Sequence, residues 1–418
     1  MKLAKYLMLF VVVFVTLFTT GCTSKEKVAP IKETDKSNAD KVISTNASNE
    51  YSTIQKNNFD FSLLTSIQSK KSDENICISP ISFKMALLLA CNGADGETKK
   101  EILQSLNLKD EPIENINTNF QNTLNNLNYS NEGVTLNVIN AIWANESIKD
   151  DNIFNEYSST IKKFNLSDIN FLKFNEKDKS AQIINKWVSD NTKRKISGII
   201  SPDEIKDDLV TIITNAVYFN GKWNEAFEKE NTKEKDFNID NQTVKCQMMS
   251  KYFETNYFEN DKYQSIKIPY KNSTSMYVFL PSKEMGILDF IKDLHMSDID
   301  KKIAEMSMRE GSLELPKFKS EFKIDIPFSG KNSFNKIASI KNGKIAIDKI
   351  VQKTFIDLNE EGTEAAAITA ITMQTTAAMP FDPPKPFSMI VDRPFFYFIM
   401  DDTNKEIIFM GIVNNPNK

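Results

Sequence analysis

A tract of small residues near the carboxyl end constrains the fold of this chain more than any other feature. The tract runs from Asn359 to Ala367 with the sequence NEEGTEAAA, and segments predicted as strands lie on both sides of it. Side chains this small let one backbone pass between two others, and Gly362 supplies a pivot because it lacks a Cβ. The pattern is therefore typical of a segment that moves relative to the body of the protein.

The composition is that of an ordinary folded protein. The chain has 418 residues, of which 40% are hydrophobic and 26% are charged, so it forms one large domain or two ordinary ones. Its net charge is -4. A mildly acidic protein lacks the basic surface that nucleic acids bind, so nucleic acid is excluded as the main partner.

The amino terminus predicts export and a lipid anchor. Lys2 and Lys5 precede an apolar run, Tyr6 to Phe18, which is followed by Thr19-Thr20-Gly21-Cys22. A positive start, a hydrophobic stretch and small residues are typical of a secretory signal peptide. The Gly-Cys ending resembles a bacterial lipobox, in which the cysteine receives the lipid. The alternative is an ordinary cleaved signal peptide with an incidental cysteine. A permanent transmembrane helix is disfavoured, because the apolar run is shorter than the ~20 residues that span a bilayer.

We therefore predict a lipoprotein-type signal peptide over residues 1–21 and a flexible tether over 22–50, which is polar and poor in large apolar residues. The protein would then be exported, outside the cell or at its surface, and held at a membrane through Cys22. The globular body should begin near Tyr51.

Three further cysteines, Cys77, Cys91 and Cys246, are predicted to be buried and reduced. Cys77 and Cys91 flank a helix-like run and would lie roughly 20 Å apart along it, which exceeds disulfide reach. The sequence has no CxxC motif and no cluster of metal-ligand residues, so neither a metal nor a cofactor is predicted.

Hydrophobic periodicity places helices mainly in the first half of the body and strands mainly in the second, which predicts an α+β fold. Ser79 is a good N-cap and Pro80 suits the first helical position, so a helix should begin there and end at Asn92-Gly93. Further helices are predicted at 58–70, 96–106, 113–127, 152–164 and 180–193. Strands are predicted at 134–144, 209–219, 275–280, 312–316, 349–358, 395–400 and 407–413, the second of them buried on both faces.

Seven motifs follow one another in a fixed order over more than 300 residues. They are NICISPIS from Asn75, LNVINAIW from Leu136, INKWV from Ile184, TNAVYFNGKW from Thr214, LPKF from Leu315, the tract from Asn359, and FMGIVNNP from Phe409. Each motif alone is weak, but together they resemble the serpins. These protease inhibitors trap their target by inserting their own cleaved loop into a β-sheet.

The resemblance covers nearly the whole body and implies a single serpin domain over residues 51–418. It implies three β-sheets, about eight or nine helices and an exposed reactive loop at about 362–391. It also implies a monomer that is not an enzyme and that forms covalent complexes with serine proteases, with cysteine proteases as a further class of target.

The resemblance assigns two sets of functional residues. The hinge of the loop comprises Glu361, Gly362, Thr363, Glu364, Ala365, Ala366 and Ala367. The region where the central strands part comprises Ser79, Ser82, Asn215, Trp223 and Gln352. The family usually has histidine where this chain has Gln352. Glutamine both donates and accepts hydrogen bonds, so the bonding can survive while the pH sensitivity of an imidazole is lost.

The alternation of side chains suits insertion into a sheet. One face of an inserted tract would carry Thr363, Ala365, Ala367 and three further uncharged residues, whereas the only charge, Glu364, lies on the other face. Proline is absent from 362–376, so every backbone N–H stays free for sheet pairing. The alternative is an alanine-rich helix. Gly362 and the β-branched residues that follow oppose it.

Family spacing places the scissile bond at Thr376-Ala377, with cleavage after Met373 or Ala378 as alternatives because this loop is several residues longer than usual. Thr376 at that position disfavours trypsin-like proteases, whose pocket takes Arg or Lys. It favours elastase-like or subtilisin-like enzymes.

Two other functions are alternatives. A hydrolase would have to use His295, the only histidine, and no nucleophile elbow surrounds it. A non-inhibitory serpin would act as a surface binding module or chaperone. Charge or proline in the hinge is typical of such members, and Thr363, Ala365 and Ala367 are neither.

Overall fold

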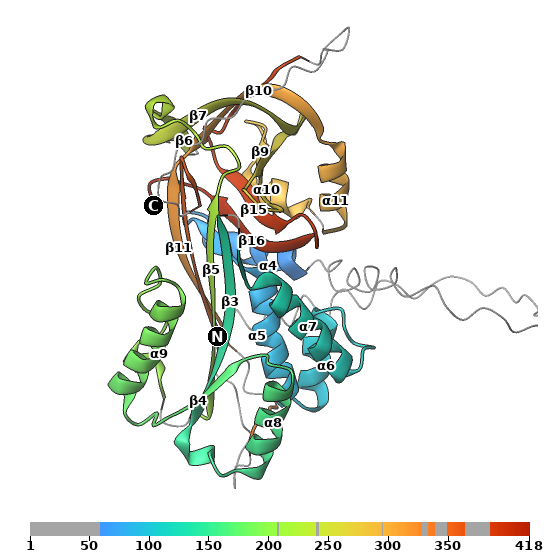
Figure 1. Ribbon diagram of the computed structural model, residues 1–418, viewed down its shortest axis with the longest axis vertical. Helices are drawn as coiled ribbons and strands as arrows, with labels where there is room; N and C mark the ends of the chain where they lie inside the picture. Colours follow the sequence, from blue (N-terminus) through green and yellow to red (C-terminus); the bar gives the residue numbers. More distant parts are fainter. Residues whose placement is uncertain are drawn as a thin grey trace, which may run out of the picture.

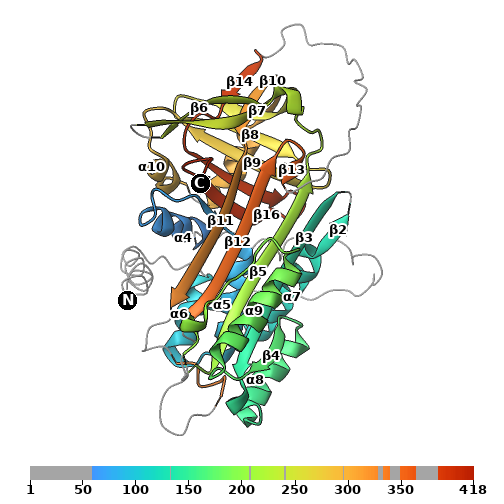
Figure 2. The same ribbon diagram turned by 90° about the vertical axis from the view of Figure 1, so that its left-hand side faces the viewer.

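The computed structural model describes residues 59–131, 133–206, 209–239, 242–294, 296–327, 333–338, 349–363 and 385–418. A long sheet with helices on both sides forms one half of the molecule, and a second, larger sheet forms the other half (Figures 1 and 2). The predicted signal peptide, the tether, Cys22 and His295 lie outside the described residues, as do Glu364, Ala365, Ala366, Ala367, Met373, Thr376, Ala377 and Ala378.

The described residues contain eight α-helices, in line with the predicted number. They are α4 (Phe59–Gln68), α5 (Pro80–Gly93), α6 (Gly96–Ser105), α7 (Ile113–Leu127), α8 (Asn152–Lys163), α9 (Lys177–Asn191), α10 (Ile287–Lys292) and α11 (Met296–Glu305), with short 3-10 turns η2 (Glu146–Ile148), η3 (Pro202–Glu204) and η4 (Lys229–Asn231). Helix α5 begins at Pro80 as predicted, but the side chain of Ser79 makes no capping hydrogen bond. The short helices α10 and α11 were not predicted.

The long sheet has seven strands. They are β2 (Tyr129–Asn131), β3 (Val134–Asn145), β4 (Asp168–Leu172), β5 (Thr211–Lys222), β11 (Phe318–Pro327), β12 (Lys349–Asn359) and β13 (Gly362–Thr363). Their order is β11-β12-β13-β5-β3-β2, with β4 beside β3 and with β12 also paired directly to β5. Helix α9 crosses the face of this sheet that is turned toward the viewer in Figure 2.

Both faces of β5 are covered, as its continuous run of apolar residues predicted. Ile213 and Val217 belong to the main hydrophobic core, to which α5 also contributes. Ile212 and Ala216 point the other way, into a smaller cluster formed with Ile184 and other residues of α9. Because successive side chains of a strand alternate between faces, one strand serves both layers.

The second sheet has nine strands. They are β1 (Ile76–Ile78), β6 (Lys233–Ile239), β7 (Gln242–Glu259), β8 (Tyr263–Pro269), β9 (Thr274–Pro281), β10 (Ser307–Pro316), β14 (Phe387–Ile390), β15 (Phe395–Asp401) and β16 (Glu406–Val413). Their order is β1-β16-β15-β9-β8-β7-β10-β14, and β6 pairs with β7.

Hydrogen bonding joins the described strands into two sheets, although three were predicted. The nine-stranded sheet is held together at one narrow joint, where β7 and β8 share only the pairs from Tyr257↔Ile266 to Glu259↔Gln264. Divided at this joint, it gives two smaller sheets, and the predicted count of three is recovered. The strand β7 is long enough to take part in both.

The three described cysteines are free and buried, which confirms the prediction. Burial raises the pKa of Cys77, Cys91 and Cys246 to about 11, so these thiols stay protonated and unreactive at neutral pH. Among the described helices, none is both long and apolar enough to cross a bilayer. The described residues also contain no group of three or more side chains that could hold a metal ion.

Candidate functional site

The centre of the long sheet contains a seam, by which we mean the boundary between residues 213–222 of β5 and 350–359 of β12. The two strands run parallel and pair at one end only, from Ile350↔Ile213 to Lys353↔Ala216. At the other end β13 lies between them, with Thr363 opposite both Leu358 and Gly221. In the intervening stretch, 217–220 and 354–357, no pairing across the seam occurs within the described residues.

Gly362 makes this entry into the sheet possible. It lies opposite Lys222 on β5 and Asn359 on β12, with a φ angle of +148°. A Cβ atom at this position would lie 2.0 Å from the carbonyl oxygen of Gly221 and 2.9 Å from the Cα of Lys222. No other residue fits here without a shift of the backbone, so glycine is a steric requirement at this position.

The side chain of Thr363 is already inside the protein, with the residue 1% exposed. Its hydroxyl is hydrogen bonded to that of Tyr270 at 2.7 Å. The ring of Tyr270 stacks on Trp223 with centroids 4.4 Å apart, and burial raises the pKa of its hydroxyl far above the ordinary value. Trp223 in turn donates from Nε1 to the carbonyl of Asn359 at 3.0 Å. Tyr270 and Trp223 therefore form the buried pocket wall against which Thr363 lies.

Glu360, two positions before Gly362, is held in place by hydrogen bonds to its carboxylate. Glu360 is 5% exposed and accepts hydrogen bonds from Lys317 at 3.0 Å and from the hydroxyl of Thr232 at 2.8 Å. Burial opposes ionisation, but these hydrogen bonds outweigh it and hold the pKa of Glu360 below its ordinary value. Its neighbour Glu361 pairs with Lys229 at 2.8 Å. The chain therefore enters the hinge from a fixed starting point.

A buried polar cluster holds the paired end of the seam on the α5 face. Gln352 accepts from the backbone N–H of Ser79 at 3.1 Å and donates to its carbonyl at 3.0 Å and to Asn215 Oδ1 at 3.2 Å. Ser82 also donates to Asn215 Oδ1, and Asn215 donates to Asn140 at 2.8 Å. Gln352 thus both donates and accepts, as its chemistry allowed.

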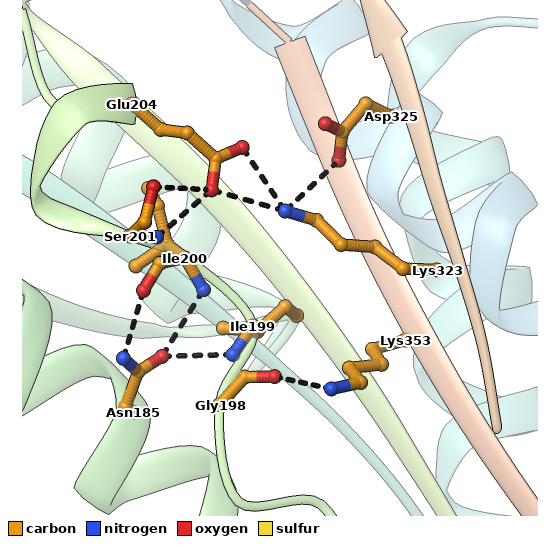
Figure 3. A network of polar contacts seen from close by, with 9 residues as sticks. All are labelled: Asn185, Gly198, Ile199, Ile200, Ser201, Glu204, Lys323, Asp325 and Lys353. Carbon is orange, nitrogen blue, oxygen red and sulfur yellow. Dashed lines mark hydrogen bonds and ion pairs between the residues drawn. The ribbon is translucent and has the colours of Figure 1, made fainter.

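The opposite face of the seam is held by a segment that we call the strap, residues 197–206, which connects α9 to β5 (Figure 3). Asn185 of α9 fixes its shape by accepting from Ile199 and donating to the carbonyl of Ile200, both at 2.8 Å. Lys353 donates to the carbonyl of Gly198 at 2.7 Å. The strap therefore ties the beginning of β5 to β12.

The strap also balances a pair of like charges. Lys323 of β11 lies directly opposite Lys353 of β12, an arrangement that destabilises a sheet when it is left uncompensated. Glu204 of the strap pairs with Lys323 at 3.0 Å, and Glu321 pairs with Lys353. Removal of the strap would leave Lys323 with only the distant carboxylate of Asp325, at 3.8 Å.

The structure divides the predicted sheet-opening residues into two groups. Ser79, Ser82, Asn215 and Gln352 form one cluster, whereas Trp223 lies at the far end of the seam beside the hinge. Sequence reasoning missed Tyr270, Lys317 and the strap. Tyr270 meets Thr363 across 93 positions of sequence, so no local pattern could have indicated this contact.

Comparisons with known proteins identify the family. The family model described as "Serpin (serine protease inhibitor)" matches residues 55–416. An uncharacterised serpin-like protein of Methanosarcina acetivorans is 32% identical, over 96% of this chain and 94% of that protein. The leukocyte elastase inhibitor of Equus caballus is 27% identical, over 86% of this chain and 97% of that protein.

Solved structures agree with the fold. The native state of the thermophilic serpin tengpin matches with a TM-score of 0.75 and 27% identity, over 90% of this chain and 96% of that one. Human thyroxine-binding globulin matches with a TM-score of 0.77 over 88% of this chain and 99% of that one, and its 23% identity shows the fold alone. The predicted α+β serpin fold is confirmed.

We expect Gly362→Ala to destabilise the protein by about 1–3 kcal/mol, because the new Cβ cannot coexist with the carbonyl of Gly221. The midpoint of thermal unfolding at a fixed scan rate measures the effect. Gly286→Ala is the matched control, since its Cβ would meet no atom closer than 3.8 Å. Equal midpoints for the two variants would contradict the steric role of Gly362.

We expect Glu360→Gln to lower stability at pH 7 by about 1–2 kcal/mol, since the charge-assisted hydrogen bonds from Lys317 and Thr232 weaken. The pKa of Glu360 is lowered in the folded protein, so its contribution is complete above the ordinary value of 4.5 and is lost as the pH falls through the folded value. Thermal midpoints between pH 3 and 7 should therefore converge at the acidic end. Glu176→Gln, which removes an exposed partner of Lys179, is the control and should show little effect.

Proposed function

The chain belongs to the serpin family, and we propose that it inhibits serine endopeptidases as a suicide substrate. The protease serine attacks the carbonyl carbon of the scissile residue, Thr376 in our assignment. The peptide bond to Ala377 breaks, its nitrogen leaves with a proton, and an ester joins inhibitor and protease. Insertion of the loop then carries the protease away before water hydrolyses the ester. The family description, serine protease inhibitor, also supports the expectation that the chain is not an enzyme.

One observation supports this proposal above all others: the seam already holds Gly362 and Thr363 in sheet register between β5 and β12. Each further residue that enters would move one position down β5 and β12. Glu364, Ala365, Ala366 and Ala367 would fill the stretch that has no pairing across the seam. The small side chains of the three alanines minimise the steric cost of entry.

Deeper insertion must separate paired strands. In the same register Ile368 would lie level with Lys353 and Ala216, the last pair of the closed end. Thr369 would follow between Gln352 and Asn215, where its hydroxyl could replace part of the hydrogen bonding that insertion disrupts. The polar cluster and the strap would therefore set the barrier to insertion, and cleavage would free the chain to cross it.

We propose elastase-like or subtilisin-like enzymes as targets. The assigned Thr376-Ala377 bond presents a small side chain to the protease, and the name of the equine relative, leukocyte elastase inhibitor, is in line with an elastase. Incubation with elastase and with subtilisin, followed by denaturing gels and mass spectrometry of the released peptide, tests the class and the bond. A non-inhibitory member would be nicked without forming a covalent complex.

We expect Thr363→Arg to convert the inhibitor into a substrate, with about tenfold less covalent complex, because a buried charge without a partner opposes insertion beside Tyr270. Stoichiometry titrations against subtilisin measure the change. Glu364→Arg is the matched control, since alternation places that position on the solvent face. Full inhibition by Thr363→Arg would refute the insertion register.

We also propose that the protein is exported and held at a membrane through a lipid on Cys22, on the basis of its amino-terminal sequence. Expression in bacteria with a radioactive fatty acid should label the full chain, and detergent partitioning should place it with the membrane fraction. Cys22→Ser should remove the label and release the protein. Equal labelling of the two forms would favour the ordinary signal peptide.

A further inference from the structure

One face of the nine-stranded sheet is exposed to solvent where β14 joins it. The strands β7, β10 and β14 lie side by side near one end of the molecule (Figure 2). Three large apolar side chains on this face are exposed: Tyr252 at 62%, Met308 at 52% and Ile390 at 45%. Within the described part of the chain, four large apolar residues are exposed, and these are three of them. Their concentration on three adjacent strands is therefore not a general property of the surface.

The same face carries two like charges in direct opposition. Glu254 of β7 and Glu310 of β10 are register partners across the antiparallel ladder. Side chains in such positions have Cβ atoms about 5 Å apart, and like charges there destabilise a sheet. Neither carboxylate has an ion-pair partner among the described residues, and Glu310 accepts only a 3.4 Å hydrogen bond from the hydroxyl of Tyr252.

Neighbouring charges are satisfied, which sets this pair apart. Glu314, four residues further along β10, pairs with Lys235 at 2.6 Å. Arg309 points to the other face, where it lies 5.2 Å from the ring of Tyr257 and contacts Glu259. Cations of the protein therefore neutralise these neighbouring carboxylates, whereas none of the described residues supplies a cation to Glu254 or Glu310. An arrangement that costs stability and lacks an internal cation is suited to a cation brought by a partner.

The position of the pair identifies the partner. β14 is parallel to β10, with Gly311 opposite Phe387, so Glu310 lies level with Pro386. The reactive loop was expected to extend to about residue 391, but residues 387–390 are already paired in the sheet as β14, so Pro386 lies where the chain returns from the loop. Glu254 lies one strand further, at the 4.7–4.9 Å spacing of paired strands. A protease bound to the segment that ends at β14 would therefore come close to this face.

We propose that the acidic sheet face, comprising Tyr252, Glu254, Met308, Glu310 and Ile390, binds a basic surface beside the active-site cleft of the target protease. This inference rests on the proposed inhibitory function and adds a second contact to it. The two carboxylates speed the encounter by attracting Lys and Arg side chains, and Tyr252 and Met308 pack against the apolar parts of those side chains. The face selects basic proteases among those that could cleave the loop.

The test compares Glu254→Gln/Glu310→Gln with Glu97→Gln/Glu114→Gln, which makes the same change in net charge on α6 and α7. A strongly basic elastase and subtilisin are the probes. We expect the second-order rate constant for covalent complex formation with the basic elastase to fall about tenfold in the sheet-face variant at low salt and to change little in the control. The difference should shrink at high salt because screening weakens the attraction.

A second measurement uses the same elastase with its catalytic serine replaced by alanine, so that only reversible binding is observed. The sheet-face variant and Tyr252→Ala should both bind it more weakly than the wild type. The thermal midpoint of Glu310→Gln should rise slightly, since the opposition to Glu254 is relieved. This stability readout also shows that the variants are folded.

Each result has one meaning. Equal rate constants for the wild type and the sheet-face variant, in the presence of a normal covalent complex, would overturn the docking proposal and leave the inhibitory function intact. Absence of a covalent complex from the wild type would overturn the inhibitory function itself. A dimer of the wild type that the sheet-face variant does not form would identify a second copy of the chain as the occupant and would also overturn the proposal.

Discussion

The structure depends on a sheet whose two central strands are paired at one end and parted at the other. Gln352 and Lys353 occupy the last two pairs before β5 and β12 separate, and they point to opposite faces. Gln352 is bonded to the amino end of α5, and Lys353 is bonded to the strap that follows α9. Two adjacent side chains therefore hold the closed end of the seam to the layers above and below it. Hydrogen bonds in a buried site are costly to break without replacement, so the closed end resists opening until another strand supplies new partners.

At the open end of the seam, a third strand, β13, already lies between β5 and β12. Gly362 allows a backbone approach that any Cβ would block, and Tyr270 and Trp223 bury the hydroxyl-bearing side chain of Thr363. Glu360 anchors the preceding residue through Lys317 and Thr232. Gly362 and Thr363 are therefore already in register within the seam. In the mechanism that we propose, insertion would continue in this register and would meet its barrier at the polar cluster.

The seam and the proposed docking face belong to different sheets, and the segment between β13 and β14 connects them. β13 fixes one end in the long sheet, and β14 fixes the other in the nine-stranded sheet. Phe387 of β14 stacks on Tyr257 at 4.5 Å and leaves no room for a side chain at Gly311, so this end is held firmly beside Glu310. The proposed insertion and the proposed docking therefore depend on different sheets, and the residues that serve each can vary independently in sequence.

The sequence by itself determined the elements whose patterns are strong and local. The doubly buried strand at 211–222, the helix from Pro80 and the small-residue tract follow from apolar continuity, proline geometry and the absence of a Cβ. The strands β6 and β7 escaped prediction because exposed charged residues blur their alternation. Only the tertiary structure decided that Gln352 meets Ser79 across 273 positions and that Glu254 faces Glu310. Such contacts depend on strand register and side-chain direction, which arise when distant segments pack together and leave no trace in local composition.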